Sequence, residues 1–150
     1  MKKFFLVALV TVCTVFASGC GSEKKLNCSK DFSSTMPSGI KLNQETEIIF
    51  KGKKIDQLDM SMQFEIPESY KNNMDTFVNT MKTTYENQYG KYEAVKVEIE
   101  EVSDLKFNVN IKMDYNALND SEKKALGASN GSESYSANKK SLEDAGYTCK

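Results

Sequence analysis

Apolar and polar residues alternate along two stretches in the first half of the chain. This period of two is typical of strands that have one buried and one solvated face. A turn at Lys51-Gly52-Lys53 separates the stretches, and Pro67 removes a backbone donor just after the second one. The buried faces are expected at Ile40, Leu42, Thr46, Ile48 and Phe50, and at Leu58, Met60, Met62, Phe64 and Ile66. The pattern therefore predicts a β-hairpin.

From Glu68 the spacing of apolar residues changes to that of a helix. The apolar positions lie one turn or two turns apart, and Gly90 ends the pattern. They are Tyr70, Met74, Phe77, Val78, Met81 and Tyr85. This spacing predicts an amphipathic helix whose single apolar stripe packs on another apolar surface.

A second hairpin follows the predicted helix. Val95, Val97 and Ile99 alternate with charged residues, and the segment 105–115 alternates without a fault from Leu105 to Tyr115. The turn is expected at Val102-Ser103-Asp104. Such regular alternation favours an antiparallel sheet that is covered on one side.

The remaining segments complete the predicted fold. Asn119 and Glu122 have the spacing of a capping box for a short helix that stops at Gly127, a polar loop "ASNGSES" follows, and a last helix is expected over 136–145. The segment "KLNCSKDF" favours a short edge strand. We predict an α+β fold in which an antiparallel sheet of four to five strands, in ββαββα order, has its helices packed on one face.

The N-terminus has the layout of a secretory signal. Lys2 and Lys3 precede an apolar stretch over 4–17 that is too short for a comfortable membrane span, and "ASGC" at 17–20 resembles a bacterial lipobox. The interpretation is a cleaved signal peptide over 1–19, a lipidated Cys20 with a short linker over 20–25, and a single domain over 26–150. The alternative is an ordinary secretory signal in which Cys20 is incidental.

Lipidation would place the protein at a cell membrane. Fatty acyl chains such as palmitate on Cys20 would hold it there, facing outside the cytoplasm of a bacterium. Without Lys2 and Lys3 the chain keeps 18 lysines against 21 acidic residues, so its net charge favours neither nucleic acid nor an anionic membrane surface as a partner. The sequence contains no arginine, histidine or tryptophan, which removes imidazole as a base or metal ligand.

Cys28 and Cys149 are the two cysteines that remain once Cys13 leaves with the signal and Cys20 is acylated. Disulfides are allowed outside the cytoplasm, so we predict that these two residues pair. A redox role is the alternative, but the chain has no Cys-x-x-Cys spacing and no histidine to lower a thiol pKa.

Two groups of residues raise the question of chemistry. The acidic cluster Glu98, Glu100, Glu101 and Asp104 could hold calcium or supply an acid and a base, whereas the simpler interpretation is a solvated strand face. The methionines at 60, 62, 74, 81 and 113 could suggest a copper site, but they fall at core periods. We therefore expect no catalytic residue, no metal and no cofactor.

Tyrosines near the helix ends are the candidate binding surface. Exposed aromatic side chains often contact partners, although several should only seal the edge of the core. The set consists of Tyr85, Tyr89, Tyr92, Tyr135 and Tyr147.

Three stretches carry a resemblance to a known group of proteins. They are "TEIIFKGKKI", "FNVNIKMDYNAL" and the ending "SLEDAGYTCK". The chain resembles the YehR-like small bacterial lipoproteins, and the similarity to lipoproteins of low-GC Gram-positive bacteria implies such a source. The resemblance implies a lipobox, two strand hairpins and two helices, and it supplies no catalytic residue.

The sequence thus favours a membrane-anchored binding module for an envelope protein or a small ligand. One alternative is a structural lipoprotein for envelope homeostasis. The other is a carboxylate-dependent hydrolase that uses Glu98, Glu100 or Asp104, so the enzyme question stays open and leans towards no activity.

Overall fold

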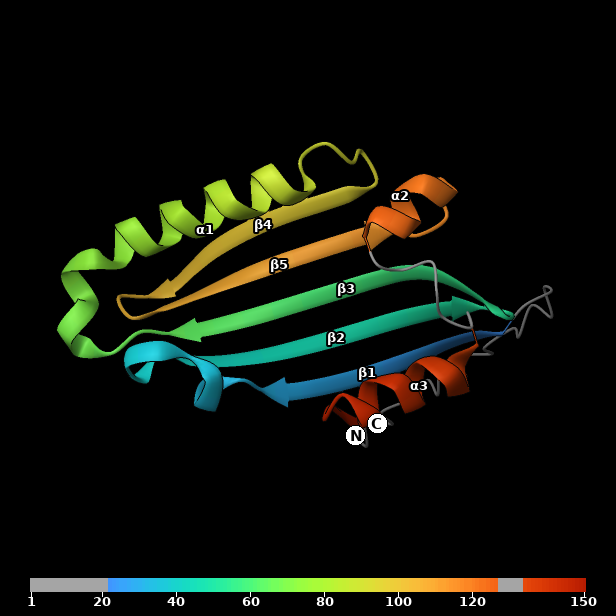
Figure 1. Ribbon diagram of the computed structural model, residues 1–150, viewed down its shortest axis with the longest axis horizontal. Coiled ribbons are helices and arrows are strands. Elements are labelled where there is room, and N and C mark those ends of the chain that lie inside the picture. The colour runs from blue at the N-terminus through green and yellow to red at the C-terminus, as the bar shows by residue number, and fades with distance from the viewer. Residues whose placement is uncertain (1–21, 127–133) are drawn as a thin grey trace, which may run out of the picture.

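The computed structural model describes residues 22–126 and 134–150 as one antiparallel sheet with helices on one face (Figure 1). Its strands are β1 (Glu23–Asp31), β2 (Lys41–Lys51), β3 (Lys54–Glu65), β4 (Val95–Ser103), β5 (Lys106–Asp114) and β6 (Thr148–Cys149). The α-helices are α1 (Met74–Tyr89), α2 (Asp120–Ala125) and α3 (Tyr135–Asp144), and the 3-10 helices are η1 (Ser33–Thr35), η2 (Pro37–Gly39) and η3 (Glu68–Asn73). The predicted α+β class is confirmed.

The sheet has six strands in the order β4-β5-β3-β2-β1-β6, more than the four to five predicted. The segment around Cys28, expected as a short edge strand, is a full strand of nine residues that pairs with β2 along its whole length. It begins at Glu23, inside the expected linker. The sequence did not predict the sixth strand, because β6 has only two residues and is too short to show an alternation of apolar and polar positions.

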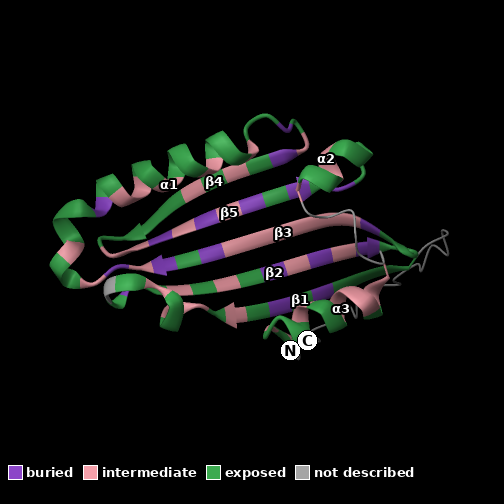
Figure 2. Ribbon diagram, viewed as in Figure 1, coloured by how far each residue is buried: buried purple, intermediate pink, exposed green. Residues whose placement is uncertain are grey.

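The core lies between the helices and the face of the sheet that they cover, named here the inner face. Phe50, Phe107, Ile111 and Val109 are almost completely buried there, and the buried positions run across the middle strands in Figure 2. Alternation in β5 is complete, with every second side chain buried from Phe107 to Met113. The interior of this face matches the apolar positions predicted from the sequence.

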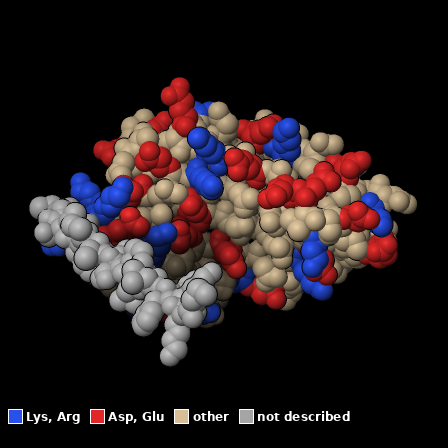
Figure 3. All heavy atoms as spheres, turned by 180° about the vertical axis from the view of Figure 1, so that it is seen from behind, with Lys and Arg blue, Asp and Glu red and all other residues tan. Residues whose placement is uncertain are grey.

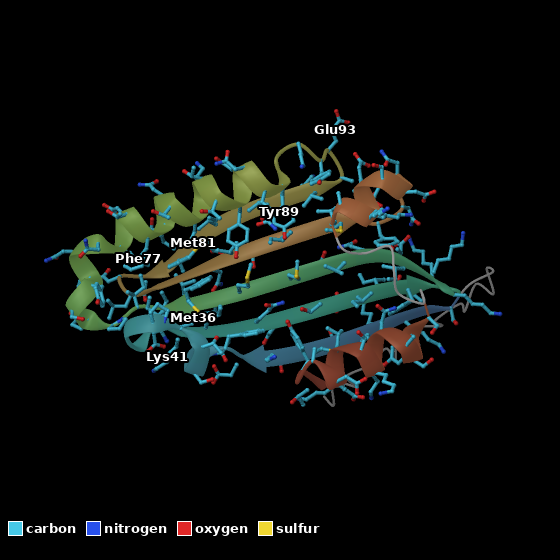
Figure 4. The ribbon with its side chains drawn as sticks, in the orientation of Figure 1. Met36, Lys41, Phe77, Met81, Tyr89 and Glu93 are labelled. Atoms are coloured by element: carbon cyan, nitrogen blue, oxygen red, sulfur yellow. A yellow bond between two sulfur atoms is a disulfide. The ribbon has the colours of Figure 1, made fainter. Side chains whose placement is uncertain are left out.

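Both long helices contact the inner face at opposite edges of the sheet. The Tyr85 hydroxyl of α1 donates to Met62 Sδ at 3.3 Å, and Tyr135 of α3 packs on Phe50 with ring centroids 5.5 Å apart. In Figure 4 the side chains of Phe77, Met81 and Tyr89 point from α1 towards the sheet. The apolar stripe predicted for this helix therefore serves to cover β4 and its neighbours.

Two element boundaries differ clearly from the prediction. The residues from Glu68 to Asn73 form the 3-10 helix η3, so α1 starts only at Met74. The second hairpin turns at Asp104 and Leu105, because Val102 and Ser103 continue β4 through a register shift. The polar loop predicted after α2 lies almost entirely outside the described residues, as do the signal peptide and Cys20.

Two further predictions, the cap of α2 and the cysteine pair, are confirmed. Asn119 accepts a hydrogen bond from the Glu122 backbone N–H at 3.0 Å, and the Glu122 carboxylate accepts one from the Asn119 N–H at 2.9 Å, which is a capping box. Cys28 and Cys149 form a disulfide that fastens β6 to β1.

Candidate functional site

The face of the sheet opposite the helices, named here the outer face, is polar and uncovered by any described helix. The strand register places its side chains in rows. One row joins Glu47, Asp59 and Lys112, and the next joins Glu45, Ser61 and Asn110. Each residue of a row comes from a different strand, so the group exists only in the folded sheet.

A shallow hollow of about 610 Å³ lies on this outer face and is lined by residues of all six strands. We name it the polar hollow. It is lined by Asn27, Cys28, Ser29, Glu45, Thr46, Glu47, Asp59, Met60, Ser61, Glu98, Asn110, Lys112, Thr148 and Lys150. Figure 3 shows this side of the molecule, with acidic side chains spread across its middle.

The polar hollow offers many hydrogen-bonding groups that are already oriented. Ser61 Oγ donates to Asn110 Oδ1 at 2.7 Å, and Gln57 Nε2 donates to both carboxylate oxygens of Asp59 at 2.8 Å. Neighbouring polar side chains therefore hold one another in place at its floor. Such an arrangement suits a ligand with several hydroxyl, amide or amine groups, because each group can find a partner on a different strand.

The charges of the polar hollow are mostly negative. Four carboxylates line it, from Glu45, Glu47, Asp59 and Glu98, against the two lysines Lys112 and Lys150. Glu47 is also paired with Lys25, at 3.3 Å. The balance favours a neutral or cationic ligand over an anionic one.

The acidic cluster predicted from the sequence is divided by the fold. Glu98 lines the polar hollow, whereas Asp104 lies in the β4–β5 turn and pairs with Lys71 at 2.7 Å. The hydrogen bond and charge of Lys71 lower the pKa of Asp104, so this carboxylate stays ionised and is a poor general acid. Among the described residues, no group of histidine, cysteine, aspartate or glutamate side chains could hold a metal ion.

The candidate tyrosines do not form one surface. Tyr85 and Tyr89 stack on each other along α1 with ring centroids 6.1 Å apart, and burial raises the pKa of both hydroxyls. Tyr92 is buried in the core. Tyr135 packs on Phe50, and Tyr147 meets Phe32 edge-to-face at 6.0 Å, near the edge of the sheet opposite to the one that α1 covers. These contacts show the core-sealing role that the sequence left open.

The methionines also lie where the periodicity placed them. Met62, Met74 and Met113 are buried, while Met60 and Met81 are partly buried against the same core. The sulfur of Met60, for example, accepts a hydrogen bond from the Gln44 side-chain amide at 3.7 Å.

Sequence reasoning missed the polar hollow. The polar positions of the alternating strands were recognisable in the sequence as the solvated side of each strand. The sequence does not show that these positions lie together in one hollow. Which of those positions become neighbours depends on the strand order, since β3 lies next to β5 and β4 is at the edge.

The comparisons with known proteins bear on the fold alone. No protein-family model matches the chain, and no curated protein sequence matches it either. The chain is similar to the NMR structure of a protein from Streptococcus pneumoniae TIGR4, with a TM-score of 0.57 and 15% identity, covering 100% of this chain and 97% of the other. Within the described residues, none of the helices has the length and apolar character needed to cross a membrane.

Proposed function

We propose that this protein is a lipid-anchored lipoprotein on the outer face of a bacterial cell membrane, and that the polar hollow binds an envelope partner or a small polar ligand. The observation that carries the binding role is the hollow itself, in which carboxylate, amide and hydroxyl groups from six strands converge. The lipobox-like "ASGC" at 17–20 supports the anchor at Cys20. The resemblance to YehR-like lipoproteins stays a prediction.

The chemistry of the hollow supports a ligand that is neutral or cationic and rich in hydrogen-bonding groups. An amino sugar, a polyhydroxylated envelope polymer or a lysine-bearing segment of a partner protein would satisfy these groups. A purely structural role in the envelope is the alternative, and a hydrolase using Glu98 or Glu100 ranks below both, because these carboxylates lie on an open strand face.

The anchor is tested by metabolic labelling. Cells that express the full chain are grown with a fatty-acid probe, and the Cys20→Ala variant is the comparison. The wild-type protein should carry the label and the variant should lose it. A labelled Cys20→Ala protein would show that lipid is attached elsewhere.

The binding role is tested by crosslinking in living cells. A photo-crosslinking amino acid at Asn110 reports on the polar hollow, and the same amino acid at Glu86, an exposed residue of α1, is the matched control. The proposal is supported if a crosslinked species forms from position 110 and not from position 86. The same species should disappear when the Asp59→Asn and Glu98→Gln substitutions are added. Identical products from both positions would contradict it.

A further inference from the structure

The end of the sheet that lies nearest to the proposed anchor is basic. The register places Glu23 of β1 opposite Lys51 of β2, and Lys51 opposite Lys54 of β3, so the start of β1 and the β2–β3 turn are side by side. Figure 1 shows these strand ends together at one end of the molecule. Four lysines stand there, at 24, 51, 53 and 54, against the three acids Glu23, Asp56 and Asp114, whose charges all act on Lys51.

Three of these lysines are free to meet a partner. Lys51 pairs with Asp56 at 2.7 Å, which neutralises both. For Lys24, Lys53 and Lys54, all exposed, the described part of the chain provides no salt-bridge partner. Gly52 adopts a φ of +65° in the turn, and this tight turn puts Lys53 at the tip of the hairpin.

The far end of the sheet has the opposite character. Three of its lysines have carboxylate partners, since Lys41 and Lys106 share Glu65, at 2.9 Å and 3.0 Å, and Lys71 pairs with Asp104 at 2.7 Å. Lys30 instead donates to the Ala145 carbonyl oxygen. Acidic side chains without a lysine partner among the described residues include Asp31, Glu68 and Glu101. The molecule is therefore polarised along its strands, although its net charge is negative.

The covalent chain brings the basic end close to the membrane. Glu23 is three residues beyond Cys20, and three residues reach at most about 11 Å. Neighbouring strands are about 4.8 Å apart, so the β2–β3 turn lies only one or two strand spacings from this point. The distance from the anchored residue to these lysines is therefore similar to the Debye length, which is about 10 Å at 0.1 M salt, so their charges can still interact with lipid headgroups.

We propose that Lys24, Lys53 and Lys54 form a membrane-docking surface for anionic phospholipid headgroups, which holds the sheet upright with its acidic end away from the bilayer. The docking rests on the anchor proposed at Cys20, and the lysines then set orientation. This proposal departs from the expectation based on net charge, because the distribution of the lysines, and not their total, decides how a protein meets an anionic surface.

The docking surface is tested with an artificial tether in place of the lipid. The sheet, the buried core and the disulfide all lie within residues 22–150, so this part contains every element of the described fold, and circular dichroism checks that it is folded before use. The chain contains no histidine, so an N-terminal hexahistidine tag on 22–150 is its sole attachment to nickel-chelating lipid. Vesicles of phosphatidylcholine alone and with phosphatidylglycerol are compared, and an amine-acylating reagent reports the exposure of each lysine by mass spectrometry.

We expect Lys24, Lys53 and Lys54 to be acylated more slowly on phosphatidylglycerol vesicles than on phosphatidylcholine, with Lys71 unchanged. Each lysine near an anionic surface should favour the docked state about fivefold. Lys53→Glu/Lys54→Glu should restore the reactivity of Lys24, whereas the matched control Lys71→Glu/Lys82→Glu should leave the protection intact.

Equal reactivity on the two kinds of vesicle would overturn the inference, as would protection of Lys71 in place of Lys53. Protection on both kinds would also overturn it, because tethering alone would then explain the result. None of these outcomes depends on acylation of Cys20, which the metabolic labelling tests separately.

Discussion

Cys28 and Cys149 face each other across the β1–β6 pair and form a disulfide, although 121 residues separate them in the chain. The bond fastens the C-terminal strand to the strand that follows the proposed anchor. Beside it, the Lys150 N–H donates to the Asn27 carbonyl oxygen at 2.8 Å. The two ends of the domain therefore close on each other at one edge of the sheet.

Removal of this disulfide should lower the free energy of unfolding substantially. A loop of this length constrains the unfolded chain by about 4 to 5 kcal/mol. We expect Cys149→Ser to unfold at a much lower urea concentration than the oxidised wild type, and the reduced wild type to match the variant. Equal unfolding midpoints for oxidised wild type and variant would contradict this explanation.

Phe64 and Phe107 stack directly across β3 and β5, with ring centroids 4.9 Å apart, and both are buried. Phe107→Ala should cost about 3 to 5 kcal/mol, because it leaves a cavity as well as losing apolar contact. Val102→Ala is the control, since Val102 is 50% exposed and its change should stay within about 0.5 kcal/mol. Urea unfolding of both variants measures the difference, and a similar cost for the two would be inconsistent with this core.

Stability should depend on pH through Glu65, whose hydrogen bonds from Lys41 and Lys106 lower its pKa in the folded protein. A carboxyl group with a lower pKa when folded stabilises the protein above its unfolded pKa, and that contribution disappears as the pH falls through the folded value. Glu65→Gln should therefore lower the melting temperature at neutral pH, and the difference should shrink in acid.

Thermal unfolding from about pH 7 down to about pH 2 measures this effect. Glu86→Gln serves as the control, because the Glu86–Lys82 contact is long, at 4.0 Å, and exposed. A gap between Glu65→Gln and wild type that stays constant over this range would argue against the two lysines as its cause.

The capping box should matter mainly for α2. Asn119→Ala removes the side-chain acceptor for the Glu122 N–H and should cost about 1 kcal/mol. Amide hydrogen exchange within α2 should become faster, while exchange in the buried strand β5 should change less. Ser121→Ala, at an exposed position of the same helix, should leave this exchange nearly unchanged. Equal effects of the two substitutions would show that the cap is not what holds α2.

The sequence alone predicted the elements whose signal is local. Alternation at period two identified the strands of both hairpins because each has one buried face, and the Asn119–Glu122 spacing identified the start of α2 because a cap involves only neighbouring residues. The cysteine pair was also predictable, from the small number of thiols in a chain that the sequence predicts to be exported. The six-stranded count was not, since β6 pairs only through Cys149 and Thr148.

Only the tertiary structure decided which polar residues meet. Strand order sets β3 between β2 and β5, and this brings Glu47, Asp59 and Lys112 into one row across the outer face. The same register gathers Lys24, Lys53 and Lys54 at one end, whereas the five tyrosines are separated between α1, the core, α3 and the segment that joins α3 to β6. Burial of one face produces an alternating pattern within each strand, and this pattern is visible in the sequence. The neighbours of a solvated side chain depend instead on pairing between distant strands, which a local sequence pattern does not reveal.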